Sequence, residues 1–300
     1  MAGQSVGSGI ARSQWENFLG NRGEWRGSFT SLNAAAEVTG STPSILSLTP
    51  EENDTLVRFH LRRFAAEGFD VDGFEGEPTR EVRTDYRTLG RQVVFFDSGS
   101  FSKGSLQVAP RTPFGAEFGF IVGDRRFRLV QLFDEEGRFD GHVLIREFRA
   151  GSNAQERPPL QIDHLCGTWT GAAATISADW PVPEVSAAEV TVERTPSPGG
   201  DQLTIRTSLS SGVDTLSARV DADSITVEGS MPGRLQLLAD AGYSVVPLQV
   251  SHRQPFSVEA GWMPAPDRLE RLIRRYDASG AWHSSTQIIV TASASGHHSG

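Results

Sequence analysis

The most constraining feature of this sequence is that it repeats itself. The segment LQVAPRTPFGAEFGF at positions 106–120 returns as LQVSHRQPFSVEAGW at positions 248–262. Eight of the fifteen positions are identical, whereas about one identity is expected by chance at ordinary residue frequencies. A chain that repeats a segment of this length is expected to contain two copies of one folding unit.

Two further blocks repeat in the same register. GEWRG at positions 23–27 returns as GTWTG at 167–171, and RLVQLFDEEGRF at 128–139 returns as RLIRRYDASGAW at 271–282. The offsets of the three blocks are 142, 144 and 143 residues. This near-constant spacing predicts a tandem duplication of one domain.

The boundary between the copies is predicted by composition. The segment AGSNAQERPPLQ at 150–161 is polar, carries two prolines and ends shortly before the second Gly-x-Trp. Such a segment is typical of a linker. We therefore expect one domain at 1–157 and a second at 158–300.

Each half has the alternation of antiparallel β-structure. Around positions 126–148, two stretches of alternating apolar and polar residues flank the acidic, glycine-containing turn DEEGR, which is a hairpin pattern. The one clear helical segment is SQWENFLGNRGEW, in which Ser13 and Glu16 have capping-box spacing. The sequence thus predicts an all-β chain with a short N-terminal helix that could plug the end of a barrel.

A Gly-x-Trp motif opens the first strand of each half, at Gly23 and Trp25 and again at Gly167 and Trp169. The glycine permits close backbone approach, and the tryptophan can cover the open end of a barrel. Motif and meander together resemble the calycin superfamily, which includes the lipocalins. We expect two tandem antiparallel lipocalin-like β-barrels, each of them closed separately.

Composition limits the classes of partner. Apolar residues make up 38% of the chain, with 17 Phe and 6 Trp, so a packed core is expected. The net charge of −9 argues against nucleic acid, which requires a basic footprint. No apolar run is long enough to span a bilayer, the first residues lack a signal core, and the single Cys166 needs no oxidising compartment. We expect no membrane insertion and a cytoplasmic location.

Four charged residues recur in the long repeat: Arg111 and Glu117 in the first copy, Arg253 and Glu259 in the second. One interpretation is a structural ion pair, or turn-anchoring contacts, in each barrel, because buried charges need partners. The other is a pair of ligand-binding groups inside the barrel. A constraint shared by both copies favours the structural interpretation.

An acidic segment at 67–85, EGFDVDGFEGEPTREVRTD, has no obvious match in the second copy. An insertion in one copy alone is a place where partner specificity can evolve, and a solvated loop is the alternative. Its candidate partner contacts are Asp70, Asp72, Phe74, Glu75 and Glu77.

No pattern for catalysis stands out. The histidines lack metal-ligand spacing, and no phosphate-binding loop, dinucleotide fingerprint or nucleophile elbow is present. The sequence therefore predicts no catalytic residue, no metal and no cofactor.

The sequence resembles a family of tandem-barrel proteins of cyanobacteria and plastids, a domain of unknown function that includes the chloroplast ATP synthase biogenesis factor. The resemblance is carried by WENFLGNRGEWRGSFT, GSFSKGSLQVAPRTPFGAEFGFIVGDRRFRLVQLFD, LIREFRAGSNAQERPPL and SHRQPFSVEAGW, so it covers nearly the whole chain. It implies a non-enzymatic role in assembling the β and γ subunits of the F-type ATP synthase head. The chain lacks a transit extension, so the resemblance implies a cyanobacterial protein or a trimmed plastid form in the stroma.

Two alternatives stay open. A lipocalin-like barrel can carry a pigment or another small apolar ligand, and calycin barrels also host cofactor-free enzymes. Packed lumens would exclude both alternatives together.

Overall fold

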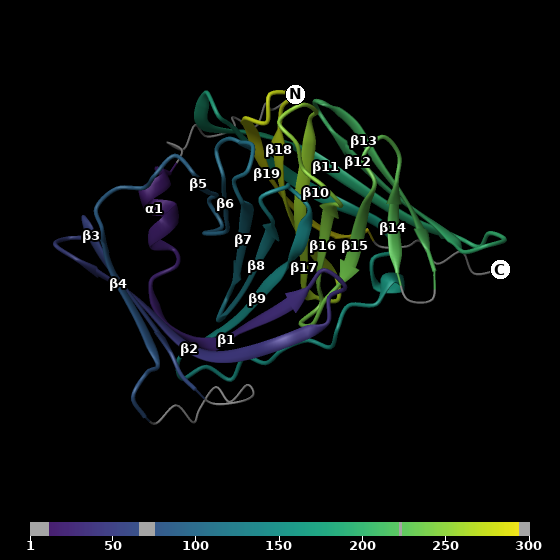
Figure 1. Cartoon of the computed structure of the whole chain (residues 1–300). Helices are drawn as coiled ribbons and strands as arrows, with labels where there is room; N and C mark the ends of the chain where they lie inside the picture. The colour runs from purple at the N-terminus through teal and green to yellow at the C-terminus, as the bar shows by residue number, and fades with distance from the viewer. Residues whose placement is uncertain (1–11, 66–75, 222–223, 294–300) are drawn as a thin grey trace, which may run out of the picture.

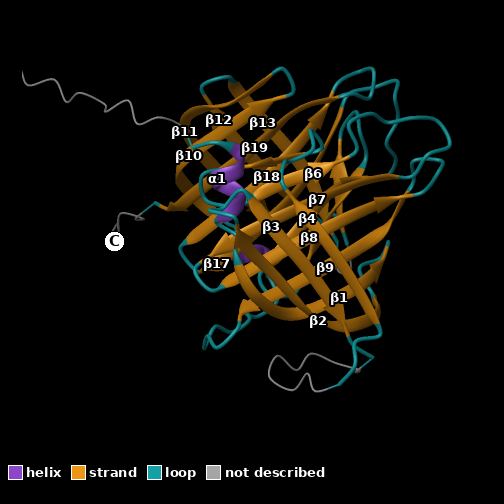
Figure 2. Cartoon of the chain, turned by 90° about the vertical axis from the view of Figure 1, so that its left-hand side faces the viewer, coloured by secondary structure: helices purple, strands orange, loops and turns teal. Residues whose placement is uncertain are grey.

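The computed structural model describes residues 12–65, 76–221 and 224–293, and it is almost entirely β-strand (Figure 1, Figure 2). In the described part of the first half, the first element is helix α1 (Gln14–Leu19). Nine strands follow: β1 (Gly23–Asn33), β2 (Val38–Glu51), β3 (Leu56–Arg63), β4 (Arg80–Tyr86), β5 (Val93–Phe95), β6 (Phe101–Gly104), β7 (Phe114–Val122), β8 (Arg125–Phe133) and β9 (Phe139–Arg149).

The second half begins with a single turn of 3-10 helix, η1 (Ile162–His164). Ten strands follow: β10 (Gly167–Ser177), β11 (Trp180–Thr195), β12 (Asp201–Leu209), β13 (Gly212–Val220), β14 (Ile225–Glu228), β15 (Gly233–Leu237), β16 (Gly242–Pro247), β17 (Phe256–Ala265), β18 (Arg268–Tyr276) and β19 (Trp282–Ala292).

Both halves are antiparallel meanders in which the first strand also pairs with the last. β1 lies between β2 and β9, and β10 lies between β11 and β19. The prediction of an all-β chain with two tandem barrels and a short N-terminal helix is confirmed. The capping box is also present, because Ser13 Oγ accepts from the Glu16 N–H while the Glu16 carboxylate accepts from the Ser13 N–H.

The two halves differ in closure. The ten strands of the second half form a closed ring, whereas the nine strands of the first form a curled sheet that ends at β4 on one side and β5 on the other. In the second half the short strand β14 joins β13 to β15, and the first half has loop at the corresponding place, residues 87–92. The expectation that both barrels are closed is therefore wrong for the first.

Helix α1 lies at the seam of the first sheet rather than at a barrel end. The Phe18 ring contacts Tyr86 of β4 at 5.8 Å and Phe95 of β5 at 5.2 Å between centroids. The Gln14 amide donates to the Phe95 carbonyl and accepts from the Phe95 N–H. The helix thus bridges, through side chains, the two edges that no strand joins.

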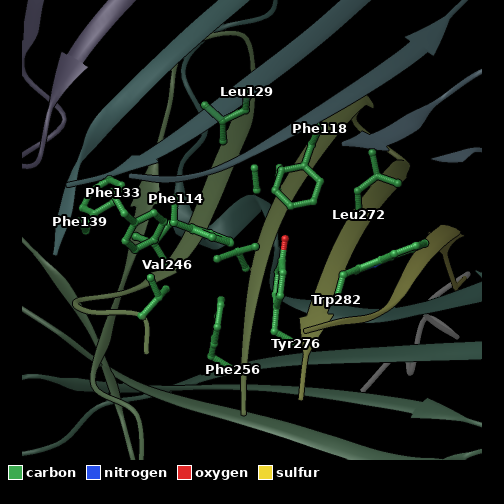
Figure 3. Close-up of a cluster of buried hydrophobic side chains, with 14 of the residues drawn as sticks. Phe114, Phe118, Leu129, Phe133, Phe139, Val246, Phe256, Leu272, Tyr276 and Trp282 are labelled. Atoms are coloured by element: carbon green, nitrogen blue, oxygen red, sulfur yellow. The ribbon is translucent and has the colours of Figure 1, made fainter. Parts of the chain in front are cut away.

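The halves pack against each other through the outer faces of β7 and β8 and of β16 to β18. Their apolar side chains form one cluster that crosses between the halves (Figure 3). The ring of Phe114 lies 5.5 Å from that of Phe256, its own counterpart in the repeat. Contact between equivalent residues indicates a pseudo-two-fold axis between the halves, as in an isologous dimer interface.

Backbone hydrogen bonds follow the same symmetry. The Val108 N–H donates to the Gly280 carbonyl at 2.8 Å, and its counterpart Val250 donates to Gly137 at 2.8 Å. The Leu106 carbonyl accepts from the Trp282 N–H, and the Leu248 carbonyl accepts from the Phe139 N–H. Each copy of the repeated LQV segment therefore pairs with the final hairpin turn of the other half. This contact gives a physical reason for the repeat.

Candidate functional site

The two Gly-x-Trp motifs occupy corresponding places, at the start of β1 and β10. Gly23 and Gly167 have φ of 121° and 127°, a region that favours glycine. The indole N–H of Trp25 donates to the Asn21 carbonyl and that of Trp169 to the Leu165 carbonyl, both at 2.9 Å. Each buried ring is therefore fixed to the backbone four residues before it.

Each lumen contains one buried carboxylate–guanidinium pair at equivalent positions. In the first half the Arg128 guanidinium donates to Glu117 Oε1 at 2.6 and 3.0 Å. In the second half Arg271 donates to both carboxylate oxygens of Glu259 at 2.7 and 3.0 Å. The repeated glutamates are thus held by the arginine that begins the third repeated block.

The expected pairing of these glutamates with Arg111 and Arg253 is wrong. Both arginines lie exposed in the turns before β7 and β17. Arg111 has φ of 55°, and the Arg253 N–H is bonded to Ser251 Oγ at 3.2 Å. Each arginine lies six positions before its glutamate, and the chain between them turns before it enters the lumen-lining strand. The ion pair instead forms across neighbouring strands.

The second-half pair is part of a larger polar network. The Tyr243 hydroxyl donates to Glu259 Oε1 at 2.7 Å, and the Arg271 guanidinium donates to Thr207 Oγ1 at 2.6 Å. Burial, and next the Glu259 charge, raise the pKa of Tyr243 well above its usual value. Burial opposes the charge of Arg271, but Glu259 outweighs it and raises the guanidinium pKa. Both charged groups of this network, Glu259 and Arg271, have their partners within it. Such mutual pairing is typical of a structural role.

The first lumen carries additional charges. Arg126 approaches Glu147 at 3.2 Å, Arg128 also approaches Glu147 at 3.4 Å, and Lys103 approaches Glu117 at 3.5 Å. Burial lowers the pKa of Arg126 to about 10, partly offset by Glu147. Burial opposes ionisation of Glu117, but Arg128 and then Lys103 outweigh it and lower its pKa. The Arg126 guanidinium therefore stays protonated at neutral pH, and the Glu117 carboxylate stays ionised.

Both halves enclose open space. The second barrel has a cavity of about 680 Å³ that is lined by Glu259 and Arg271 and also by Asp214, Arg275 and His283. The first half has one of about 220 Å³ that is lined by Glu117 and Arg128. Neither lumen is filled by side chains, so the packed lumens that would exclude a ligand are not observed.

The acidic segment at 67–85 is only partly described. Asp70, Asp72, Phe74 and Glu75 lie outside the described residues, and Glu77 is exposed. The expectation of one long loop is wrong at its end, because residues 80–85 belong to β4 and pair with β3. Alternating Arg, Glu and Asp side chains on this edge strand are typical of a solvated face.

A buried polar network between the halves was missed by the sequence analysis. Gln131 Nε2 donates to Ser244 Oγ at 2.8 Å, and His142 Nε2 lies 2.8 Å from the same oxygen. Burial lowers the pKa of His142 to about 3, so the imidazole is neutral. The alignment of the repeats could have indicated it, because the symmetry-related positions hold Ser102, Arg274 and Ser285, which are also bonded to one another.

Two other kinds of site, a metal centre and a membrane-spanning helix, depend on geometry that the described residues show. The described ranges hold no group of three or more His, Cys, Asp or Glu side chains placed to share a metal ion. Among helices of the described part of the chain, none is long and apolar enough to cross a membrane.

Fold and lumens define a class of protein: two calycin-like β-barrels, one closed and one curled open, joined about a pseudo-two-fold axis. Residues 11–152 match the model of the N-terminal domain of DUF3598, a domain of unknown function. Residues 156–292 match the C-terminal domain of Biogenesis factor required for ATP synthase 1. A comparison with curated proteins finds no match.

Among solved structures, a DUF3598 protein of unknown function from Nostoc punctiforme is 34% identical, with a TM-score of 0.84 over 94% of this chain and 100% of that one. The chain belongs to the DUF3598 family. A putative outer membrane protein from Bacteroides fragilis is 12% identical, covers 92% of this chain and 99% of its own, and has a TM-score of only 0.23. A TM-score this low does not indicate a shared overall fold.

Proposed function

We propose that this chain is a non-enzymatic assembly factor for the catalytic head of the F-type ATP synthase and that it binds the β and γ subunits. The observation that carries the proposal is the match of the whole second barrel to the C-terminal domain of an ATP synthase biogenesis factor. The function requires a location where the head is assembled, the cyanobacterial cytoplasm or the plastid stroma.

The surface of the second barrel supports a protein partner. The hairpin of β10 and β11 exposes Trp180 at 64%, Val182 at 47% and Val185 at 69% of their surfaces. Exposed aromatic and apolar side chains gathered on one element are typical of contact surfaces. We expect this hairpin to contribute apolar contacts and the acidic segment near Glu77 to contribute contacts that weaken with salt.

The experiment is a pull-down with purified cyanobacterial β and γ subunits at low and high salt. The variants are a deletion of residues 66–75, Trp180→Ala, and the control Val38→Ala, an exposed valine of the first half. The proposal predicts binding that Trp180→Ala weakens and Val38→Ala leaves unchanged. Absence of binding to both subunits at low salt would contradict it, while unchanged binding after the deletion would move the contact to the second barrel.

The cavity of about 680 Å³ in the second barrel favours a carrier as the second candidate function. Its size lies within the usual range for ligand sites, about 300–1,000 Å³. Native mass spectrometry of the purified chain tests this alternative: a stoichiometric bound molecule without affinity for either subunit would favour the carrier over the assembly factor.

A further inference from the structure

The two lumens have the same central ion pair but differ in the charges around it. In the second half Glu259 faces Arg271, and the positions equivalent to Lys103, Arg126 and Glu147 are Val245, Leu269 and Val290. In the first half these three positions are charged. Among the described residues, therefore, the three charges that surround the central pair in the first lumen are replaced by apolar side chains in the second.

That cluster is unbalanced. Counted over the described residues, Lys103, Arg126 and Arg128 face two carboxylates, Glu117 and Glu147, at contacts of 2.6 to 3.5 Å. The excess is one positive charge. Arg126 has 4% of its surface exposed, its Nη1 atom lies 3.2 Å from Glu147 Oε2 without making a hydrogen bond, and it shares that carboxylate with Arg128. A buried charge without full compensation is costly, and a bound anion would offset that cost.

The charged cluster lines the cavity of about 220 Å³, whose remaining walls are mainly apolar. Lys103, Glu117, Arg126 and Arg128 line one part of it. The rest is lined mainly by apolar side chains: Phe18, Leu46, Leu48, Phe59, Phe95 and Phe101. An apolar cavity of about 150 Å³ accommodates benzene, so this one has room for a single ring with a charged substituent.

The open seam gives the cavity an entrance. Thr88, Leu89 and Gly90 line it, and they belong to the loop at residues 87–92 that stands where the closed barrel has a strand. The same absence of a strand that leaves the sheet open thus connects the charged cluster to solvent.

We propose that the first half binds a small organic monoanion, with its carboxylate against Arg126 and Lys103 and its apolar body between the phenylalanines. The excess positive charge favours an anionic group on the ligand, and the apolar walls favour an apolar body. The site is independent of the assembly function, because it lies inside the sheet and the proposed subunit contacts lie on the surface.

Benzoate and its neutral analogue benzyl alcohol test the proposal on the full chain by isothermal titration calorimetry. For a ligand of this size we expect benzoate to bind with a dissociation constant on the order of 1 mM or tighter, and at least about fivefold tighter than benzyl alcohol. Equal affinities, or no benzoate binding, would overturn the proposal.

Two variants locate the site. Lys103→Met removes the excess charge at a side chain that is 50% exposed, and it should weaken benzoate about fivefold or more while changing benzyl alcohol little. The matched control Arg83→Met removes a charge from a side chain that is 70% exposed on β4 and should change neither. Leu89 lines the cavity, so Leu89→Trp fills part of its volume and should weaken both probes. Full benzoate affinity in both Lys103→Met and Leu89→Trp would overturn the proposal.

Discussion

At the scale of single residues, each half is organised around one glutamate that accepts from one arginine. Glu259 and Arg271 are 9% and 5% exposed at their side chains, and Glu117 and Arg128 are 15% and 13% exposed. Removing one partner leaves the other charge buried and unpaired, which costs far more than the pair itself contributes.

We therefore expect Arg271→Ala to lower the free energy of unfolding by about 3–5 kcal/mol, and Arg128→Ala by an amount at the lower end of that range. Arg111→Ala and Arg253→Ala should change it by less than about 0.5 kcal/mol, because both side chains are exposed. Urea unfolding of the four variants measures this. Large losses in Arg111→Ala and Arg253→Ala but not in the other two variants would show that the exposed arginines have the structural role instead.

His142 makes the contact between the halves sensitive to acid. Its folded pKa of about 3 lies below the unfolded value, so the unfolded chain takes up the proton first. The stability that the neutral imidazole contributes is complete above about pH 6.5 and is lost as the pH falls toward 3. The shift of Asp240, whose pKa burial raises to about 6, acts in the opposite direction.

Comparing the wild type with His142→Gln isolates the pH effect of His142, because Asp240 is present in both proteins. Between pH 6.5 and 4.5 we expect the wild type to lose roughly 2–3 kcal/mol more stability than the variant. Urea midpoints across this range measure the difference. Parallel pH profiles would mean that His142 takes up its proton while folded.

At the scale of elements, the second glycine of each Gly-x-Trp-x-Gly motif holds the first strand against the last. A Cβ on Gly171 would overlap the carbonyl oxygen of Ile289 in β19, and one on Gly27 would overlap that of Arg146 in β9. The motif thus supplies close backbone approach at its second glycine as well as a positive φ at its first.

Gly171→Ala should therefore destabilise the chain by about 1–3 kcal/mol, the usual cost of overpacking. The control is Gly40→Ala in β2, where an added Cβ meets nothing within 4 Å. Thermal unfolding of the two variants checks the prediction, which fails if both have the same midpoint.

At the scale of the whole molecule, the halves behave as a dimer fused into one chain. The reciprocal hydrogen bonds of Val108 and Val250, the contact of Phe114 with Phe256, and the shared apolar cluster all lie on one interface. An interface with interior-like packing is expected to hold without the linker.

We expect the halves to stay together after the linker is cut. A protease site inserted between Ser152 and Asn153 allows cleavage of the folded protein, and both fragments should co-elute in size-exclusion chromatography at the volume of the intact chain. Separation of the fragments without denaturant would show that the linker, rather than the interface, holds the halves together.

The sequence alone determined the duplication, the strand alternation and the position of the Gly-x-Trp motifs, because each depends on local patterns that survive in the residue order. In β8, however, period-two alternation shows two faces without showing which faces inward. Arg126 and Arg128 line the lumen while Phe127 and Leu129 face the other half, the reverse of an isolated barrel with a solvated outer face.

Only the tertiary structure decided the partners of Glu117 and Glu259, the open seam between β4 and β5, and the network around His142. These features depend on contacts between residues far apart in the chain. The repeat shows which residues are equivalent in the two halves, but it does not show which residues lie close together in space. The physical reason is the interface: once the outer apolar faces are buried against each other, the charged faces must turn into the lumens, where they have to find partners.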